Sequence, residues 1–339
     1  MQLNEIWFLI VGFLFIGYFV LDGFDFGVGM SLPFLGKDDT DRRVLINTIG
    51  PVWDLNETWV IVAGASLFAA FPEWYASLFS GFYLPLLLIL LALIVRGVAF
   101  EYRGKGKTVG ANEVVWKRNF DWMIVIGSAV PSLLWGVAFA NIVQGVPLNE
   151  QHVYTGTIFT LLNPYGLLGG LVTLTLFWTH GLMFIALKTD GDIKDRASKL
   201  ATKVGIVCTG LAAAFLTWTL ISHWSVLGFI LSAVAAVTLI SGLIANYFKR
   251  EGIAFSFIVV TIITAVGSLF SALFPNVFPS STNPAFSLTI ENASSSQYTL
   301  TVMTWVAIIM IPLVLLYQGW TYWVFRNRIS RKSIPAGSH

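Results

Sequence analysis

The sequence predicts an all-α polytopic membrane protein with nine transmembrane helices, arranged as two four-helix bundles plus one peripheral helix. The 339 residues are 56% apolar and only 11% charged, whereas about 25% of the residues in an ordinary soluble domain are charged. Nine stretches are long enough to cross a bilayer, which takes about 20 predominantly apolar residues. Short connections between successive stretches favour antiparallel neighbours, the packing of four-helix bundles.

The positions of the helices follow from the polar and aromatic segments between them. Charged connections follow the first, third, fifth and seventh stretches, and aromatic, polar or very short connections follow the others. We therefore expect one integral membrane domain, residues 1–339, with helices at about residues 5–28, 47–70, 76–100, 120–143, 164–187, 201–222, 225–247, 253–274 and 300–325.

The basic residues are sorted to one side of this arrangement. All 20 Lys and Arg residues fall within or beside connections on the same face, and none falls in the connections on the other face. Because Lys and Arg mark the cytoplasmic side of membrane proteins, the N-terminus is predicted outside and the C-terminus in the cytoplasm. The segment Met1–Glu5 has no basic residue, so we expect no cleaved signal peptide and a retained first helix.

Two pairs of acids lie at the ends of apolar stretches. Asp22 and Asp25 are three residues apart near the end of the first helix, and Asp54 and Glu57 have the same spacing at the start of the second. Residues three apart share a helix face, and an ionised acid at the centre of a membrane helix costs about 2.5–3.5 kcal/mol. Acids kept at that cost indicate function, and the chemistry they fit best is proton transfer through the cytoplasmic half of the membrane.

A structural interpretation of the same acids stays open. They could pair with Arg96 or bind helix ends, which is the preferred reading for Asp22 and is as strong as the functional one for Glu57. For Asp25 and Asp54, framed by glycines and tryptophans, we favour proton transfer. Asp121 is most simply an anchor at the start of the fourth helix.

The sequence gives little sign of a bound cofactor or metal. Of four histidines, only His180 is expected inside the membrane, and a lone histidine cannot supply bis-histidine haem ligation. Cys208 lies in an apolar helix, and no haem-attachment, zinc or nucleotide-binding spacing occurs. Glycines 23, 27 and 29 are better read as small residues that let helices approach. Most aromatic residues, including Trp320, Tyr322 and Trp323, are expected in interfacial belts.

A series of motifs spreads along nearly the whole chain. They are Asp22–Met30, Asp41–Arg43, Trp53–Glu57, Ala63–Pro72, Gly145–Pro147, Leu161–Pro164, Pro279–Ser281 and Val302–Trp305. In this order they resemble subunit II of the cytochrome bd quinol oxidases. Many relatives have glycine where this chain has Leu55, so the backbone beside Asp54 is a point of difference.

The resemblance implies a haem-free subunit of a bacterial terminal oxidase in the cell membrane. Its partner, subunit I, would carry b-type and d-type haems and reduce dioxygen to water with electrons from quinol. The resemblance assigns Asp25 and Asp54 to proton delivery, with Glu57 beside them, and places Trp53 and Trp59 at the subunit interface. It leaves open whether a structural quinone or lipid, or a small third subunit, is also bound. Membrane lipid is an expected partner and nucleic acid is not.

Two rival functions remain at this point. Intramembrane acids in a helical bundle are also typical of proton-coupled secondary transporters, although we find no inverted repeat. A purely structural scaffold would tolerate amide replacement of all four acids.

Overall fold

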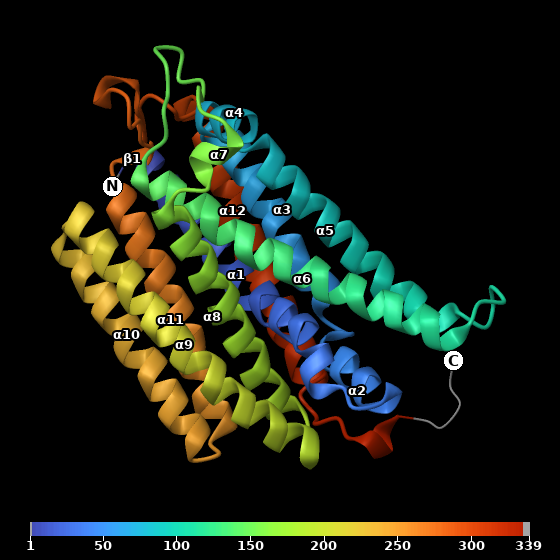
Figure 1. Ribbon diagram of the computed structural model, residues 1–339. Coiled ribbons are helices and arrows are strands. Elements are labelled where there is room, and N and C mark those ends of the chain that lie inside the picture. Colours follow the sequence, from blue (N-terminus) through green and yellow to red (C-terminus); the bar gives the residue numbers. More distant parts are fainter. Residues whose placement is uncertain (1, 335–339) are drawn as a thin grey trace.

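The computed structural model describes residues 2–334 and is almost entirely helical (Figure 1). The elements are α1 (Leu3–Leu35), α2 (Asp39–Ile49), α3 (Trp53–Ala70), α4 (Pro72–Gly81), α5 (Tyr83–Tyr102), η1 (Arg103–Lys105), α6 (Glu113–Gln144), α7 (Ile158–Leu161), α8 (Pro164–Lys188), α9 (Asp192–Ser222), α10 (Val226–Tyr247), α11 (Glu251–Leu273), β1 (Asn276–Phe278), η2 (Pro284–Phe286), β2 (Leu288–Thr289), α12 (Gln297–Val324) and η3 (Arg331–Ser333).

Several long helices begin at side chains that cap their free N–H groups. Asn112 precedes α6 and accepts hydrogen bonds from two backbone amides. Asn163 caps α8 and is followed by Pro164, whose missing N–H costs nothing at that position. Ser225 and Ser296 cap α10 and α12 in the same way. Polar capping residues therefore mark where α6, α8, α10 and α12 start.

Eight helices within residues 2–334 are long and apolar enough to cross a membrane: α1, α5 with η1, α6, α8, α9, α10, α11 and α12. The prediction of an all-α polytopic membrane protein is confirmed at this level. The predicted second helix, 47–70, is divided between α2 and α3. The 18 residues of α3 do not meet the same standard, and their first two turns carry Asp54, Asn56 and Glu57.

Helix α1 lies at the centre of the molecule, in contact with α3, α6 and α8, while α10 and α11 form one flank and α5 the other (Figure 1). The approach of α1 to α8 depends on two glycines. A Cβ atom on Gly27 would lie 2.7 Å from the Cα of Gly181 and 2.1 Å from the carbonyl oxygen of Phe177. Any larger side chain would push the helices apart, as the small-residue interpretation of this region predicted.

Helices α1, α5 and α12 run in the same direction. At one end, the indole of Trp7 donates to the carbonyl of Leu300 over 3.2 Å. Towards the other end, Phe24 packs against Tyr322, with ring centroids 6.4 Å apart, and Arg96 reaches Asp22. Since α1 and α5 are parallel, α3 must carry the chain back between them.

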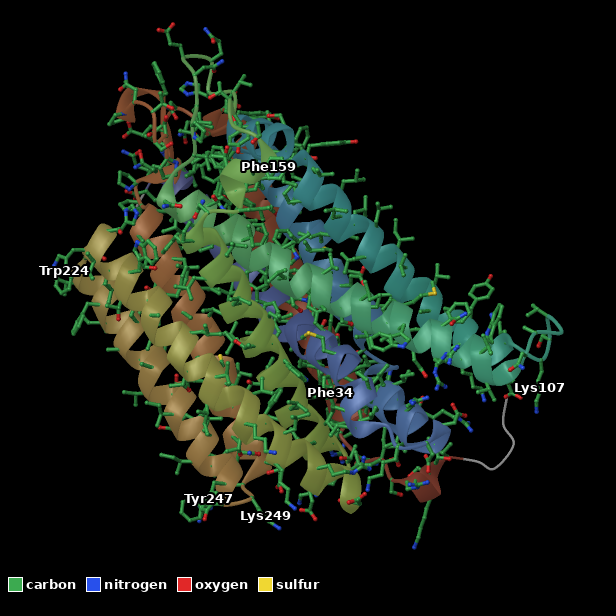
Figure 2. All side chains as sticks on the ribbon, in the orientation of Figure 1. Phe34, Lys107, Phe159, Trp224, Tyr247 and Lys249 are labelled. Atoms are coloured by element: carbon green, nitrogen blue, oxygen red, sulfur yellow. The ribbon has the colours of Figure 1, made fainter. Side chains whose placement is uncertain are left out.

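The charged connections meet at one end of the molecule. Ion pairs link the segment around α2 to the other charged connections: Lys37 with Asp192, Arg103 with Asp39, Arg196 with Asp41 and Arg331 with Asp38. Figure 2 shows Lys107 and Lys249 towards this end and Phe159 and Trp224 towards the other. We call the first the charged end. The small sheet of β1 and β2 lies at the opposite end.

Candidate functional site

A cluster of acids and one arginine lies between α1, α3 and α5. Arg96 donates from Nη2 to Asp22 over 2.7 Å and to Glu57 over 3.1 Å. The side chains of Arg96 and Asp22 are fully buried, whereas that of Glu57 is 20% exposed. The guanidinium also lies over the ring of Phe26, 4.4 Å from its centroid. Asp22 therefore has the structural partner that the sequence suggested for it.

Asp25 occupies the same buried space but makes no ion pair among the described residues. Its Oδ2 accepts a hydrogen bond of 2.7 Å from the amide of Asn56, and its Oδ1 has no protein partner in residues 2–334. The same holds for Oδ2 of Asp22 and for Nε and Nη1 of Arg96. The cluster therefore keeps free donors and acceptors close to two carboxylates.

The charges of the cluster do not balance. Asp22, Asp25 and Glu57 provide three carboxyl groups, and Arg96 is the one cation that contacts them among the described residues. Fully ionised, the four groups would carry a net charge of −2, so a neutral cluster requires two bound protons. Because net charge in a low-dielectric interior is costly, this arrangement is suited to taking up and releasing protons.

Helix α12 completes the cluster from a distant part of the sequence. Gln318 and Tyr322 each donate to Oδ1 of Asn56, over 2.9 Å and 2.8 Å. Asn56 is fully buried and so joins α12 to Asp25. Our sequence analysis missed Gln318 and placed Tyr322 in an aromatic belt. Their spacing of four residues, which puts both on one helix face, is the signal that could have found them.

Asp54 lies apart from this cluster. Its side chain is exposed on the surface of this chain and makes no hydrogen bond or ion pair with any residue of the 2–334 range. It lies one helical turn before Glu57 and closer to the charged end. The structure therefore brings Asp25 and Glu57 to one site and leaves Asp54 outside it, on the surface of this chain.

The two tryptophans that bracket these acids differ in environment. Trp59 is 6% exposed and packs on α1, where Gly17 leaves room for its ring. Trp53 is half-buried and packs against Phe100, with ring centroids 5.1 Å apart. Within this chain Trp59 is thus a packing residue of the α1–α3 contact.

A second group of charges surrounds Asp121 and Asp39 at the charged end. Arg103 donates to Asp121 over 2.6 Å, and Arg42 pairs with the same carboxylate over 3.3 Å. Partial burial alone would raise the pKa of Asp39, but hydrogen bonds from Lys117 and Arg103 hold that pKa below its ordinary value. This network joins α2, η1 and α6, as expected for Asp121 as an anchor.

His180 is a packing residue in this chain. Its Nε2 lies 3.0 Å from the carbonyl oxygen of Val20, and its ring stacks on Phe255 with centroids 4.7 Å apart. No group of three or more His, Cys, Asp or Glu side chains within residues 2–334 is arranged to hold a metal ion.

Comparison with known proteins identifies the family. The family model described as cytochrome bd terminal oxidase subunit II matches residues 3–325. The chain belongs to this family. The membership that the motif series predicted is therefore confirmed.

Relatives in the family align over nearly their full length. Cytochrome bd ubiquinol oxidase subunit 2 of Bacillus subtilis (strain 168) is 42% identical over 336 residues, covering 98% of each chain. Cytochrome bd-I ubiquinol oxidase subunit 2 of Escherichia coli (strain K12) is 40% identical over 375 residues, covering 99% of this chain and 98% of that protein.

The fold also matches a solved structure. A chain of the bd oxidase from Geobacillus thermodenitrificans superposes with a TM-score of 0.78 and covers 96% of this chain and 99% of its own length. Its sequence identity is 15%, so this likeness shows the fold alone.

Proposed function

We propose that this chain is the haem-free subunit II of a quinol:oxygen oxidoreductase, which supports a haem-bearing subunit I and contributes a cytoplasmic proton route. Quinol and dioxygen are the substrates of the complex, and haems b and d belong to subunit I. Membership in the family and the names of its relatives, both ubiquinol oxidase subunits, support the proposal. His180 is the one histidine in the predicted transmembrane stretches, whereas bis-histidine haem ligation would need two, and this supports a haem-free subunit.

The observation that carries the proton route is the buried, unbalanced acid cluster. Reducing oxygen to water consumes protons, and a carrier must hold and release them away from lipid. In the route we propose, protons pass Asp54 near the charged end, then Glu57 one turn further along α3, then Asp25. Asp25 suits the last position because it is fully buried, makes no ion pair within residues 2–334 and keeps Oδ1 free.

The membrane arrangement is part of the same proposal. We propose that α3 is the ninth crossing, because the parallel run of α1 and α5 requires the chain to return between them. Nine crossings place the N-terminus outside and the C-terminus, with the charged end, in the cytoplasm of a bacterial cell. The helices then form two four-helix bundles, α1 with α3, α5 and α6 and then α8 to α11, with α12 peripheral.

The exposed apolar faces suggest where the partner binds. Helices α3 and α5 expose Ile61, Phe68, Leu91 and Ile94, and Asp54 lies in the first turn of α3. We propose that subunit I covers this face, so that Asp54 and Trp53 lie at the subunit interface. A small third subunit remains an open prediction.

A structural quinone or lipid is a further expectation. An apolar cavity of about 150 Å³ lies between α6, α8, α9, α10 and α11, walled by Phe139, Leu216, Leu239 and Leu269. The wall of this cavity has almost no polar groups, which suits the hydrocarbon tail of a quinone.

The test of the proton route is Asp25→Asn in the purified two-subunit complex. We expect oxygen uptake with quinol as donor to slow by about tenfold or more, while the haem absorption spectrum stays intact. Asp195→Asn, at the surface of α9, is the matched control and should keep full activity. Unchanged turnover of Asp25→Asn would refute the route, and the proton-coupled transporter or the scaffold would then need to be reconsidered.

Asp54→Asn separates two roles at the interface. If Asp54 conducts protons, turnover falls with a normal haem spectrum; if it holds subunit I in place, the haem content of the purified membranes falls instead.

A further inference from the structure

A large cavity lies beside the end of α12. It has a volume of about 740 Å³ and lies between α1, α8, the start of α11 and the end of α12. Its inner wall is apolar and includes Leu21, Phe24, Phe184, Leu187 and Phe255. The volume falls within the range of about 300–1,000 Å³ that is usual for ligand sites.

Basic side chains form the rim of this cavity. Lys188, Arg326 and Arg328 line it, and no Asp or Glu of the described residues does. Arg328 is neutralised by Asp190, at 3.0 Å, and Glu251, at 3.6 Å.

The other two cations have no acidic partner in residues 2–334. Lys188 donates to the backbone carbonyls of Phe325 and Asn327. Arg326 donates to the carbonyl of Trp323 over 2.7 Å and lies over its ring. Two cations without an acidic partner in residues 2–334 therefore line a largely apolar cavity at the charged end of the bundle.

Helix α12 packs only loosely on the rest of the chain. Only Leu300, Gln318 and Thr321 are buried among its described residues. Trp7 holds its start and Asn56 its later part, through Gln318 and Tyr322. After Tyr322, Val324 and Phe325 line the cavity, and the chain is next held by Lys188 of α8 through the carbonyls of Phe325 and Asn327.

We propose that this cavity binds one anionic phospholipid, whose phosphate contacts Lys188 and Arg326 and whose acyl chains lie against the apolar wall. Basic pockets between membrane helices on the cytoplasmic side recognise such headgroups, and charge-assisted hydrogen bonds to phosphate are strong. A neutral quinone would leave both cations unpaired, and free phosphate would leave the apolar wall uncovered. The bound lipid fills the cavity and adds contacts between the end of α12 and the bundle. This inference requires a membrane-spanning chain and does not depend on the proton route.

The experiment uses the purified two-subunit complex after removal of loosely bound lipid. Native mass spectrometry counts the retained phospholipids, and the unfolding temperature is measured on adding phosphatidylglycerol, phosphatidylcholine with the same acyl chains, or inorganic phosphate. We expect one retained anionic phospholipid and a stabilisation that only phosphatidylglycerol produces. Equal stabilisation by phosphatidylcholine, stabilisation by inorganic phosphate, or a retained quinone in place of the phospholipid would overturn the proposal.

Two variants locate the site. Arg326→Gln should weaken phosphatidylglycerol binding about fivefold, while Lys332→Gln, the same charge change on a residue of η3 outside the cavity, should leave it unchanged. Leu187→Trp fills the apolar wall without changing the charge and should also release the lipid. The haem spectrum verifies that each variant assembles. Equal binding by the Arg326 and Lys332 variants, or full binding by Leu187→Trp, would place the lipid elsewhere and refute this site.

Discussion

Arg96 on α5 donates a 2.7 Å hydrogen bond to Asp22 on α1, and both side chains are fully buried. The two residues are 74 positions apart in the sequence, so their ion pair joins α1 to α5. Asp25, one turn further along α1, has no cationic partner among the described residues. Asp22 thus holds the arginine, whereas Asp25 makes no ion pair within residues 2–334 and is the residue to which we assign proton exchange in the proposed route.

The first prediction concerns this ion pair. Arg96→Gln leaves the carboxylate of Asp22 buried without a cation and should lower the free energy of unfolding by about 3–5 kcal/mol. The double variant Arg96→Gln with Asp22→Asn removes both charges and should recover part of that loss. Thermal unfolding of the purified complex measures both; losses that simply add would show that the two residues are not energetically coupled.

The second prediction concerns the attachment of α12. Tyr322→Phe removes one hydrogen bond to Asn56 and should lower the free energy of unfolding by about 0.5–1.5 kcal/mol. Tyr317→Phe makes the same chemical change on the exposed face of α12 and serves as the control. If hydrogen exchange in α12 speeds up equally in both variants, the bond between Tyr322 and Asn56 does not hold the helix.

The third prediction concerns the crossing of α1 and α8. Gly27→Ala would put a methyl group 2.1 Å from the carbonyl oxygen of Phe177, a backbone atom that cannot turn away. The helices must separate, at about 1–3 kcal/mol for an overpacked contact. Gly210→Ala in α9, where no atom lies within 4 Å of the added carbon, should not be destabilising. An unfolding temperature of Gly27→Ala equal to that of the wild type would contradict the observed crossing.

The fourth prediction concerns pH and the charged end. The pKa of Asp39 is lowered in the folded state, so its ion pairs stabilise the protein above the ordinary carboxyl pKa, and this contribution disappears as the pH falls through the lowered value. The difference in unfolding temperature between the wild type and Asp39→Asn should therefore be constant down to about pH 5 and shrink below about pH 4.

Glu150→Gln, on the opposite side of the molecule, is the control for the pH series. Its side chain is exposed and has no partner within residues 2–334, so its unfolding temperature should follow that of the wild type at every pH. If the unfolding temperatures of the wild type and Asp39→Asn still differ by the same amount at low pH, Asp39 acts through packing rather than through its charge.

Much of the architecture could be read from the sequence because it depends on local properties. Apolar length marks a membrane helix wherever it occurs, and charges in connections sort by side without reference to packing. The prediction of one membrane helix at 47–70 missed its division between α2 and α3, and Asp54 and Glu57 leave α3 less apolar than the eight candidate membrane helices of residues 2–334. The motif series was enough to identify the family.

The order of residues along the chain was enough to identify a helical membrane protein of the bd oxidase family with acids in its apolar helices. The partners of these polar residues follow only from the packed structure. Asp22 pairs with Arg96, and Asp25 accepts a hydrogen bond from Asn56. Tyr322 donates to Asn56, 266 residues away in the sequence. Such contacts depend on the rotation and register of helices that are remote in sequence. Spacing along one helix reveals a shared face, but only packing in three dimensions determines what that face meets.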